Sequence, residues 1–415
     1  MATEIKERSE TREHYDVGGI RLERPFRIRR MGHFGFNCRN VEGNLHFYGE
    51  LLGLYRSDPI DFGARVADKS LLAGKGSTIG WFMRHGTDHH SFVVFPGRVL
   101  DVLAGRPDHQ SEVTINQITW QVGSLREVTE ATRWLGQRHV KIRRVGRDTP
   151  GSNWHCYPID PDEHVNELYY GIEQVGWNGH SKPRAMYARG FQETPSLPQI
   201  SEFREVEDAM AQGIDIGSGY RSRPVGEARY DVGGILLPRP FKIVRVGPVH
   251  LFVKDVETSV RYYRDVLGLQ VSEEITWQGH TCVFLRCNTE HHSVGLYPIA
   301  LRAVLGLSAH TTCLSFGMQL AEYRQLRDAV SWLGERGVTI KHLPPELFPG
   351  IEHSAFAIDV DGHAIQLYHA MEQIGWDGRP RPAALRRKID NGNWPEFLDP
   401  LSDSYMGEAY LGPWG

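Results

Sequence analysis

The sequence repeats itself at a spacing of 215 residues. The stretch YDVGGIRLERPFRIRRMG, which begins at Tyr15, returns as YDVGGILLPRPFKIVRVG at Tyr230. Three further pairs follow in the same order: NLHFYGELLGL with SVRYYRDVLGL, DHHSFVVFP with EHHSVGLYP, and GIEQVGWNG with AMEQIGWDG. A repeat of this length predicts two homologous halves, each large enough to bury its own core.

The repeats set the expected domain boundaries. We expect an N-terminal arm over residues 1–25, a first domain over 26–180, a linker over 181–229, a second domain over 230–380 and a C-terminal tail over 381–415. The linker contains the amphipathic stretch QISEFREVEDAMAQ. It predicts one short helix, and we expect the connector to pack on the domains as a surface wrap or to form a subunit contact.

Composition narrows the kind of partner. Lys and Arg number 47 against 51 Asp and Glu, a formal charge of -4, so there is no basic field to attract nucleic acid or an anionic membrane. No apolar run approaches the roughly 18 residues of a membrane span, and the first residues lack the apolar core of a secretory signal. The five cysteines form no CxxC pair, which argues against a disulfide framework or a thiolate zinc site. We therefore expect a cytoplasmic protein that acts on a small molecule, and the aromatic tail favours a homo-oligomer.

Each half is itself two-fold. In the first half, strand patterns (HFGFNC, STIGWFM, HSFVVF) surround the helical pattern EGNLHFYGELLG. A second set follows, with strands INQITWQV, VKIRRV, WHCYPID and VNELYY and the helix LREVTEATRWLGQR. The unit is β-α-β-β-β. Four such modules predict an α+β fold in which paired modules form an incompletely closed sheet with a ligand on its concave face.

Motifs in the first half resemble those of a known superfamily. They are H-x6-N-x7-Y followed by LLGL (His33, Asn40, Tyr48), then DHHS, INQITWQVGSLREV and GRDTPGSNWHCYPIDPDEHVNELYYG. In this order they resemble the vicinal oxygen chelate superfamily, which includes glyoxalases, bleomycin resistance proteins and dioxygenases, and within it the two-domain type I extradiol ring-cleavage dioxygenases. The resemblance covers most of both halves. It implies four βαβββ modules paired into two vicinal-oxygen-chelate domains.

The resemblance also implies a divalent metal, Fe²⁺ in the first place, with Mn²⁺ or another divalent ion as alternatives. The three matching ligand positions are His33, Gln117 and Glu167. Strand alternation independently places these side chains on the concave face, where burial of an unpaired carboxylate costs several kcal/mol without a compensating cation. The family has His where Gln117 stands, and a Gln oxygen is a neutral, harder donor that binds a first-row metal less tightly. Alternatively, the three side chains only hydrogen-bond one another across the sheet.

Further residues match the family's acid/base and substrate-contacting positions. His90, within DHHS, matches the His that moves the catechol proton, and Tyr157 matches a Tyr that hydrogen-bonds a substrate oxygen. His155 shares the strand face of Tyr157, whereas Asp148 stands where the family usually has another His. An imidazole titrates near neutrality and a buried phenol can donate to an oxyanion, so both fit those roles. Because the same His-His pair recurs in the second half, His90 could also be part of the scaffold.

The second half has lost the matching residues. Those at the four corresponding positions are Pro248, Cys313 or Ser315, Gln366 and Phe356. His250 lies two residues beyond the first of these positions, but no carboxylate accompanies it. We therefore expect one metal site, in the first half, although extradiol enzymes of this type normally carry their metal in the C-terminal half.

Three functions remain open at this point. The first is a metal-dependent extradiol dioxygenase that cleaves a catechol-like aromatic with O₂. The second is a non-oxidative isomerase or lyase of the same superfamily, in which Glu167 or His90 moves a proton. The third is a metal-free protein that binds an aromatic compound. The sequence has no P-loop, GxGxxG, GxSxG or HExxH motif, which disfavours nucleotide-dependent, hydride-transfer, serine-hydrolase and zinc-protease chemistry.

Overall fold

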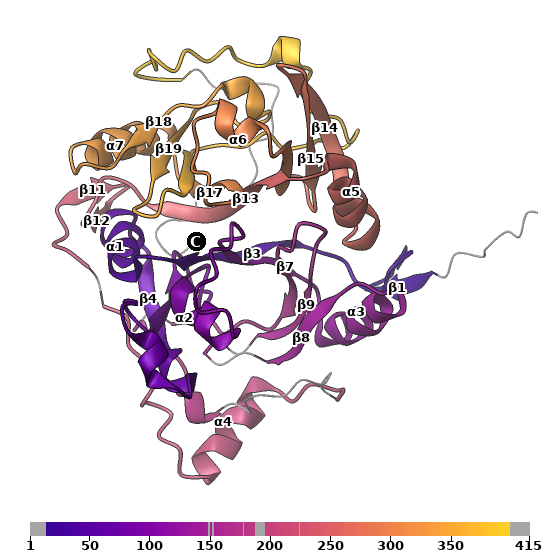
Figure 1. Cartoon of the computed structure of the whole chain (residues 1–415), viewed down its shortest axis with the longest axis vertical. Coiled ribbons are helices and arrows are strands. Elements are labelled where there is room, and N and C mark those ends of the chain that lie inside the picture. The colour runs from indigo at the N-terminus through magenta and orange to yellow at the C-terminus, as the bar shows by residue number, and fades with distance from the viewer. Residues whose placement is uncertain are drawn as a thin grey trace, which may run out of the picture.

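The computed structural model of the chain describes residues 14–147, 150–151, 153–176, 178–186, 196–223 and 225–398. Two curled eight-stranded sheets, one from each repeat, lie one above the other (Figure 1). We call them the front half and the back half. The predicted α+β fold with four βαβββ modules in two vicinal-oxygen-chelate units is confirmed.

The front half follows the predicted order of elements. Its first module contains β3 (Arg30–Cys38), α1 (Val41–Leu45) with a π-helical turn (His46–Leu51), β4 (Tyr55–Asp61), β5 (Ile79–Arg84) and β6 (Phe92–Pro96). Its second contains β7 (Ile115–Gln121), α3 (Leu125–Gln137), β8 (Ile142–Arg147), β9 (Trp154–Pro158) and β10 (Asn166–Tyr170). A small hairpin, β1 (Tyr15–Val17) and β2 (Ile20–Leu22), precedes them, and α2 (Gly97–Leu103) joins the modules. The sheet order is β4-β5-β6-β3-β7-β10-β9-β8.

The back half repeats this layout. Its first module contains β13 (Ile243–Val253), α5 (Val256–Arg261) with a π-helical turn (Tyr262–Val266), β14 (Gln270–Trp277), β15 (His280–Arg286) and β16 (Val294–Pro298). Its second contains β17 (Cys313–Leu320), α7 (Tyr323–Gly334), β18 (Ile340–Lys341), β19 (Ser354–Ile358) and β20 (Ala364–Tyr368). The hairpin β11 (Tyr230–Val232) and β12 (Ile235–Leu237) precedes them, and α6 (Leu301–Val304) joins the modules. The sheet order, β14-β15-β16-β13-β17-β20-β19-β18, is that of the front half.

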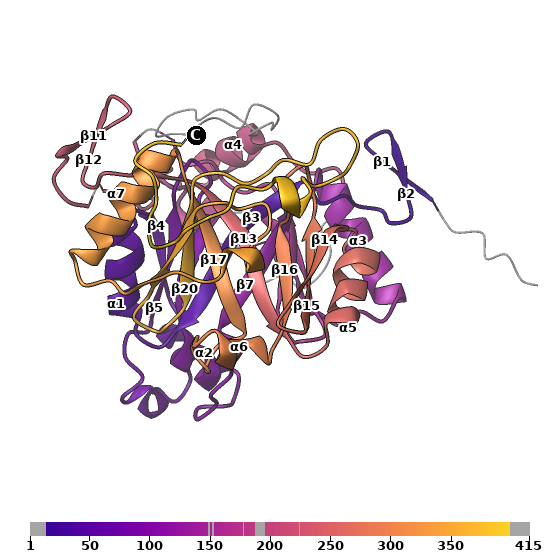
Figure 2. The same ribbon diagram turned by 90° about the horizontal axis from the view of Figure 1, so that it is seen from above.

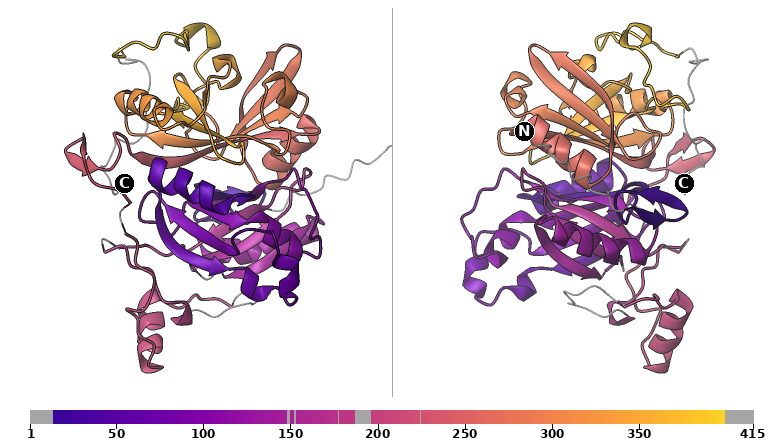
Figure 3. Two further views of the ribbon diagram at one scale, coloured as in Figure 1. Left: turned by 60° about the vertical axis from the view of Figure 1, so that its left-hand side comes forward. Right: turned by 90° about the vertical axis from the view of Figure 1, so that its right-hand side faces the viewer.

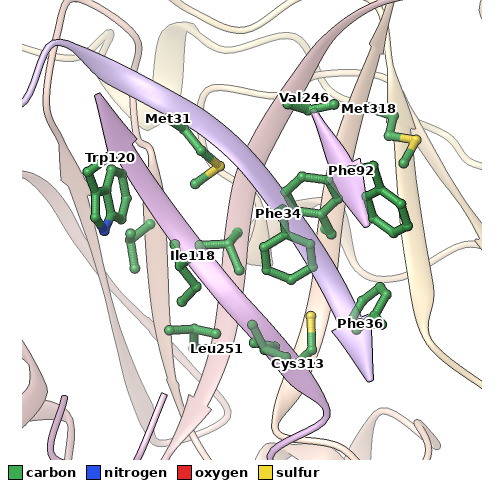
Figure 4. Close-up of a cluster of buried hydrophobic side chains, with 14 of the residues drawn as sticks. Met31, Phe34, Phe36, Phe92, Ile118, Trp120, Val246, Leu251, Cys313 and Met318 are labelled. Carbon is green, nitrogen blue, oxygen red and sulfur yellow. The ribbon is translucent and has the colours of Figure 1, made fainter. Parts of the chain in front are cut away.

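The two sheets share one apolar core where they face each other. Phe34 of β3 stacks on Phe316 of β17 with ring centroids 4.0 Å apart, and Ile118 and Trp120 of β7 lie in the same layer (Figure 4). Successive side chains of a strand point to opposite faces. Gln117 and Thr119 therefore point away from this core, into the concave face of the front sheet. Ile115 is an exception and joins the core, because the register of β3 against β7 shifts between Gly35 and Phe36.

Buried polar groups also join the halves. His363 lies 2.9 Å from Asp359 through Nδ1 and 2.9 Å from Thr114 of the front half through Nε2. The hydroxyl of Tyr48, also from the front half, donates to Asp359 at 2.8 Å. Burial alone would raise the pKa of Asp359, but the hydrogen bonds and the charge of His363 outweigh it and lower that pKa. The same arrangement occurs with the halves exchanged. His164 of the front half contacts Asp160 through Nδ1 and Thr312 of the back half through Nε2, and the hydroxyl of Tyr263, also from the back half, donates to Asp160.

The linker contains α4 (Glu202–Ala211), which stands off from both sheets (Figure 3). Arg147 at the end of β8 donates to Glu205 at 3.1 Å, and Ala209 is buried beside this contact. The apolar side of the helix is exposed, with Phe203 at 72% and Met210 at 60% of their full accessibility. Phe203 and Met210 therefore do not pack on the domains as a surface wrap would require, and the helix contacts the body through Glu205 and Ala209. The alternative, a contact with another subunit, stays a prediction. Within the described ranges, no helix has both the length and the apolar character needed to cross a membrane.

The polar contact between the halves gives a stability prediction. Asp359→Asn leaves His363 and Tyr48 without a buried anion, and removing one partner of a buried pair costs about 3–5 kcal/mol. We expect the free energy of unfolding in urea to fall by this amount. Asp328→Asn, at a partly exposed position on α7, is the control and should change it by less than about 0.5 kcal/mol. Equal stability of the two variants would show that the contacts of Asp359 with His363 and Tyr48 do not stabilise the fold.

Candidate active site

The concave faces of the two sheets differ in what lines them. In the back half, aromatic and aliphatic side chains from both modules fill the concave face; they include Phe252, Phe284, Tyr297, Phe348 and Phe356. In the front half, the corresponding apolar cluster comes from the first module and the adjoining α2, with Ile60, Phe62, Phe82, Val93 and Phe95 among its members. The second module of the front half contributes polar side chains instead. This polar wall is the candidate active site.

Two of the three predicted metal ligands meet on this wall. His33 of β3 and Glu167 of β10 are buried, and the imidazole Nε2 lies 3.0 Å from the carboxylate Oε2. Asn153 donates to the other carboxylate oxygen at 2.6 Å. The hydroxyl of Thr119 on β7 bonds both the backbone N–H of His33 and its carbonyl, at 2.5 and 2.6 Å. Thr119 thus fixes the backbone of His33 while Asn153 orients the carboxylate.

Gln117, the third predicted ligand, lies one side-chain position farther along the same face of β7. The Cα partners of this strand are Gln117 with Gly35 and Thr119 with Glu167, so Thr119 is the nearer neighbour of the His33–Glu167 pair. The Gln117 amide forms no hydrogen bond to any described residue. Among the described residues, no group of three or more His, Cys, Asp or Glu side chains could hold a metal ion. Any protein-held metal here would use one imidazole, one carboxylate and a neutral donor.

His90 ends a buried chain of hydrogen-bonding groups that the sequence did not predict. Asp58 of β4 lies 2.8 Å from Nε2 of His89, and the Nδ1 atoms of His89 and His90 are 3.0 Å apart. With a neutral His89, its Nε2–H donates to the carboxylate, its Nδ1 accepts from His90, and Nε2 of His90 is left unprotonated. The His90 ring packs edge-on to that of His33, with centroids 4.2 Å apart. Burial, and then the neighbouring imidazoles of His33 and His89, hold the pKa of His90 well below its usual range, so it is neutral at pH 7.

The back half contains the same chain, but its end is capped. Glu273, His291 and His292 repeat the spacing with distances of 2.8 and 3.0 Å. Nε2 of His292 then lies 2.9 Å from Nε2 of His250, whose Nδ1 lies 2.8 Å from Ser315. The ring nitrogen that has no hydrogen-bond partner among the described residues in the front half, Nε2 of His90, therefore corresponds to one that contacts an imidazole in the back half.

The pairing of β3 and β13 with their neighbouring strands shows which position causes the difference between the two histidine chains. Gly35 pairs with Val93 and Gln117, whereas His250 pairs with Gly295 and Ser315. His250 thus stands where the front half has Gly35, and Ser315, not Cys313, matches Gln117. A Cβ on Gly35 would lie 2.0 Å from the side chain of Val93, and one on Gly295 would lie 2.6 Å from the ring of His250. Each half places its side chain where the other has glycine.

The other predicted residues lie on β9. The rings of His155 and Tyr157 are 4.5 Å apart, and Arg144 of β8 lies over the Tyr157 ring and donates to its hydroxyl at 3.1 Å. Tyr169, beyond Glu167 on the same face of β10, lies 5.0 Å from the ring of His33. Its buried hydroxyl has no hydrogen-bond partner among the described residues. Asp148 lies outside the described residues.

Comparison with known proteins agrees with this architecture. Residues 30–168 and 244–367 match the family model of the Glyoxalase/Bleomycin resistance protein/Dioxygenase superfamily. The chain belongs to this superfamily. A 2,2',3-trihydroxybiphenyl dioxygenase of Sphingomonas paucimobilis is 28% identical over 112 residues, which is 27% of this chain and 36% of that enzyme. The similarity thus spans about a third of that relative's length.

Solved structures of the superfamily share the fold at low identity. A catechol 2,3-dioxygenase superposes with a TM-score of 0.52 at 16% identity, covering 86% of this chain and 90% of that one. The 2,3-dioxygenase of Pseudomonas sp. KL28 gives 0.54 at 14% identity, covering 85% and 96%. The Mn(II)-bound glyoxalase of Novosphingobium aromaticivorans gives 0.52 at 14% identity, covering 94% and 98%. Solved structures of dioxygenases and of a glyoxalase therefore share this fold.

The exchange of Gly35 and His250 gives a second stability prediction. Gly35→Ala should lower the free energy of unfolding by about 1–3 kcal/mol, because its Cβ would overlap the side chain and carbonyl oxygen of Val93. Adding Val93→Ala should restore part of the loss. Gly136→Ala is the control, because nothing lies within 4 Å of its Cβ position in α3, and it should raise stability by about 0.5–1 kcal/mol. An unchanged denaturation midpoint in Gly35→Ala would refute the close packing.

Proposed function

We propose that the protein is a metal-dependent dioxygenase that cleaves the ring of a catechol-like aromatic with O₂, and that its active site lies in the front half. The observation that carries the proposal is the convergence of His33 and Glu167 beside the open base position of His90. The same fold in the back half has Pro248 and Gln366 at the ligand positions and a capped base. The dioxygenase relatives support ring cleavage as the reaction class.

The donor set fits a divalent metal ion held by His33, Glu167 and Gln117. A buried carboxylate and an imidazole aimed at the same point are typical of such sites, and the unpaired Gln117 amide lies on the same face. When bound, the ion supplies a shared attachment point for the two phenolic oxygens of the substrate and for O₂, which brings both reactants together. Fe²⁺ is the ion we propose, with Mn²⁺ as the alternative.

The surrounding side chains would manage protons and charge. Nε2 of His90 is placed to accept a proton from a substrate hydroxyl, and Asp58 and His89 hold its ring in the required tautomer. The Tyr157 hydroxyl, which receives a hydrogen bond from Arg144, can donate its own proton to a substrate oxygen that gains negative charge. His155 stands beside Tyr157 and completes this edge of the site.

Removing the carboxylate tests the metal site. Glu167→Gln keeps the shape of the side chain but removes its charge, so we expect metal content after purification without chelator to fall at least tenfold and O₂ uptake with a panel of catechols to vanish. Glu130→Gln, at a half-buried position on α3 outside the site, is the matched control and should behave as the parent. Parent protein that is loaded with Fe²⁺ under nitrogen and then consumes no O₂ with any catechol would end the proposal.

Replacing the base tests the proton acceptor. We expect His90→Phe to lower kcat by about 10²–10⁴-fold, because that is the usual contribution of a positioned acid or base. KM should change less than threefold, since the ligand positions remain. His46→Phe, at an exposed position, controls for the loss of a histidine. A kcat within threefold of the parent would show that His90 belongs to the scaffold.

A non-oxidative isomerase or lyase is the second candidate. The neutral Gln117 in place of His favours it, because a weaker ligand field suits a metal that only polarises a carbonyl. The similar Mn(II)-bound glyoxalase shows that this fold also occurs in that class. Turnover under nitrogen with Zn²⁺ or Ni²⁺ would select this reaction, whereas strict dependence on O₂ selects ring cleavage.

A further inference from the structure

We propose that the back half holds a second, metal-independent binding site for a neutral hydroxylated aromatic molecule. The site is a cavity of about 790 Å³ bounded by β14, the segment 345–352, the start of α7 and the segment 381–389. Figure 2 shows the C-terminal segment, in yellow, running across the outer side of the back half. The volume is within the roughly 300–1,000 Å³ of small-molecule sites and accommodates a molecule of two fused rings.

The walls of this cavity are suited to an aromatic body. Its apolar lining includes Ile275, Trp277, Tyr323, Phe348, Ile351 and Ile389. Aromatic side chains offer flat surfaces on which another ring packs by stacking or by an edge-to-face contact. Phe348 also closes the inner end, because its ring lies 5.0 Å from Phe356 and 5.1 Å from His250. Phe348 thereby separates the cavity from His250, whereas Glu273, at the acid end of the capped chain, lines the cavity.

The charges around the cavity leave no excess for an ionic ligand. Four acidic and four basic side chains line it. Arg386 donates to Glu273 at 2.9 Å and lies 3.6 Å from Glu372, and Arg387 donates to Glu352 at 3.0 Å. Five of the eight charged side chains are thus already paired with one another, and the two signs are equal in number, so a neutral molecule is favoured over an ionic one.

One polar group in the wall has its hydrogen-bonding capacity unused. Nδ1 of His369 is buried and has no partner among the described residues. The neighbouring Tyr323, whose ring lies 5.5 Å away, already donates its hydroxyl hydrogen to the carbonyl of Pro395. Burial, followed by the charges of His353 and Arg387, lowers the pKa of His369 to about 4, so it is neutral at pH 7. Because the His369 ring lines the cavity, a rotation of the ring would turn this nitrogen toward a ligand hydroxyl, which would satisfy it.

Calorimetric titration of the full chain with 2-naphthol tests the site. This probe has one hydroxyl, so it lacks the adjacent pair that the proposed ring cleavage needs. We expect one molecule to bind in the back half, and 2-naphthoate to bind at least tenfold more weakly because its carboxylate meets the paired glutamates. Absence of a binding isotherm up to the solubility limit of 2-naphthol, or equal affinity for both probes, would overturn the proposal.

Matched tryptophan substitutions locate the binding. Ala370→Trp and Ala383→Trp fill the lining and should each weaken 2-naphthol binding at least tenfold, whereas Ala384→Trp, next to the lining in the sequence but outside it, should stay within twofold. His369→Phe should weaken binding about fivefold, the effect of one hydrogen bond. Thermal unfolding checks that each variant is folded. If Ala370→Trp or Ala383→Trp does not fold, the binding measured for the other variant tests the site.

The front-half variants separate this site from the proposed activity. Glu167→Gln and His90→Phe should leave 2-naphthol binding unchanged, because neither residue lines the cavity. Binding that survives in these variants supports the second site even if no ring cleavage is found. Binding that is lost in them and kept in Ala370→Trp places the probe in the front half and refutes the second site.

Discussion

The buried carboxylate of Glu167 is the group on which the front half depends. An isolated anion in an apolar interior costs several kcal/mol, so its surroundings must compensate for the charge. Asn153 satisfies one oxygen and His33 faces the other, and Thr119 fixes the backbone of His33 in turn. Each of these partners comes from a different strand or loop. The curled sheet is therefore held in the shape that brings one imidazole and one carboxylate to a common point.

The repeat shows how the same fold supports two different interiors. Both halves keep the acid-His-His chain, so the arrangement itself is common to the two repeats. What differs is the residue at the end of the chain. In the front half, Gly35 leaves Nε2 of the last imidazole, His90, without a partner in the described part of the chain. In the back half, the ring of His250 stands at the position of Gly35 and contacts Nε2 of His292, and Phe356 and its neighbours fill the remaining space. The proposed chemistry of the front half thus depends on the absence of a side chain at Gly35 as well as on the presence of the proposed ligands.

Residues that follow from strand alternation could be predicted from the sequence, and residues that depend on irregular backbone could not. The module order and the meeting of His33 with Glu167 follow from repeats and period-two patterning. The contact with Thr119 depends on a β-bulge between Met31 and Phe34, which shifts the register of β3 against β7. Whether Cys313 or Ser315 corresponds to Gln117 could be decided only from the structure, in which His250 pairs with Ser315. Asn153 and Asp58 approach from a loop and an outer strand, where no local pattern indicates a partner.

Strand alternation also couples the interface between the halves to the active site. Along β7, Ile118 and Trp120 enter the core shared by the two sheets, while Gln117 and Thr119 face the concave side. A shift of one residue would exchange these two sets and bury polar groups between the sheets. The stacked Phe34 and Phe316 rings and the paired Asp–His groups oppose such a shift. The back half therefore contributes to the proposed chemistry without touching substrate, because its packing fixes the register that points the proposed ligands inward.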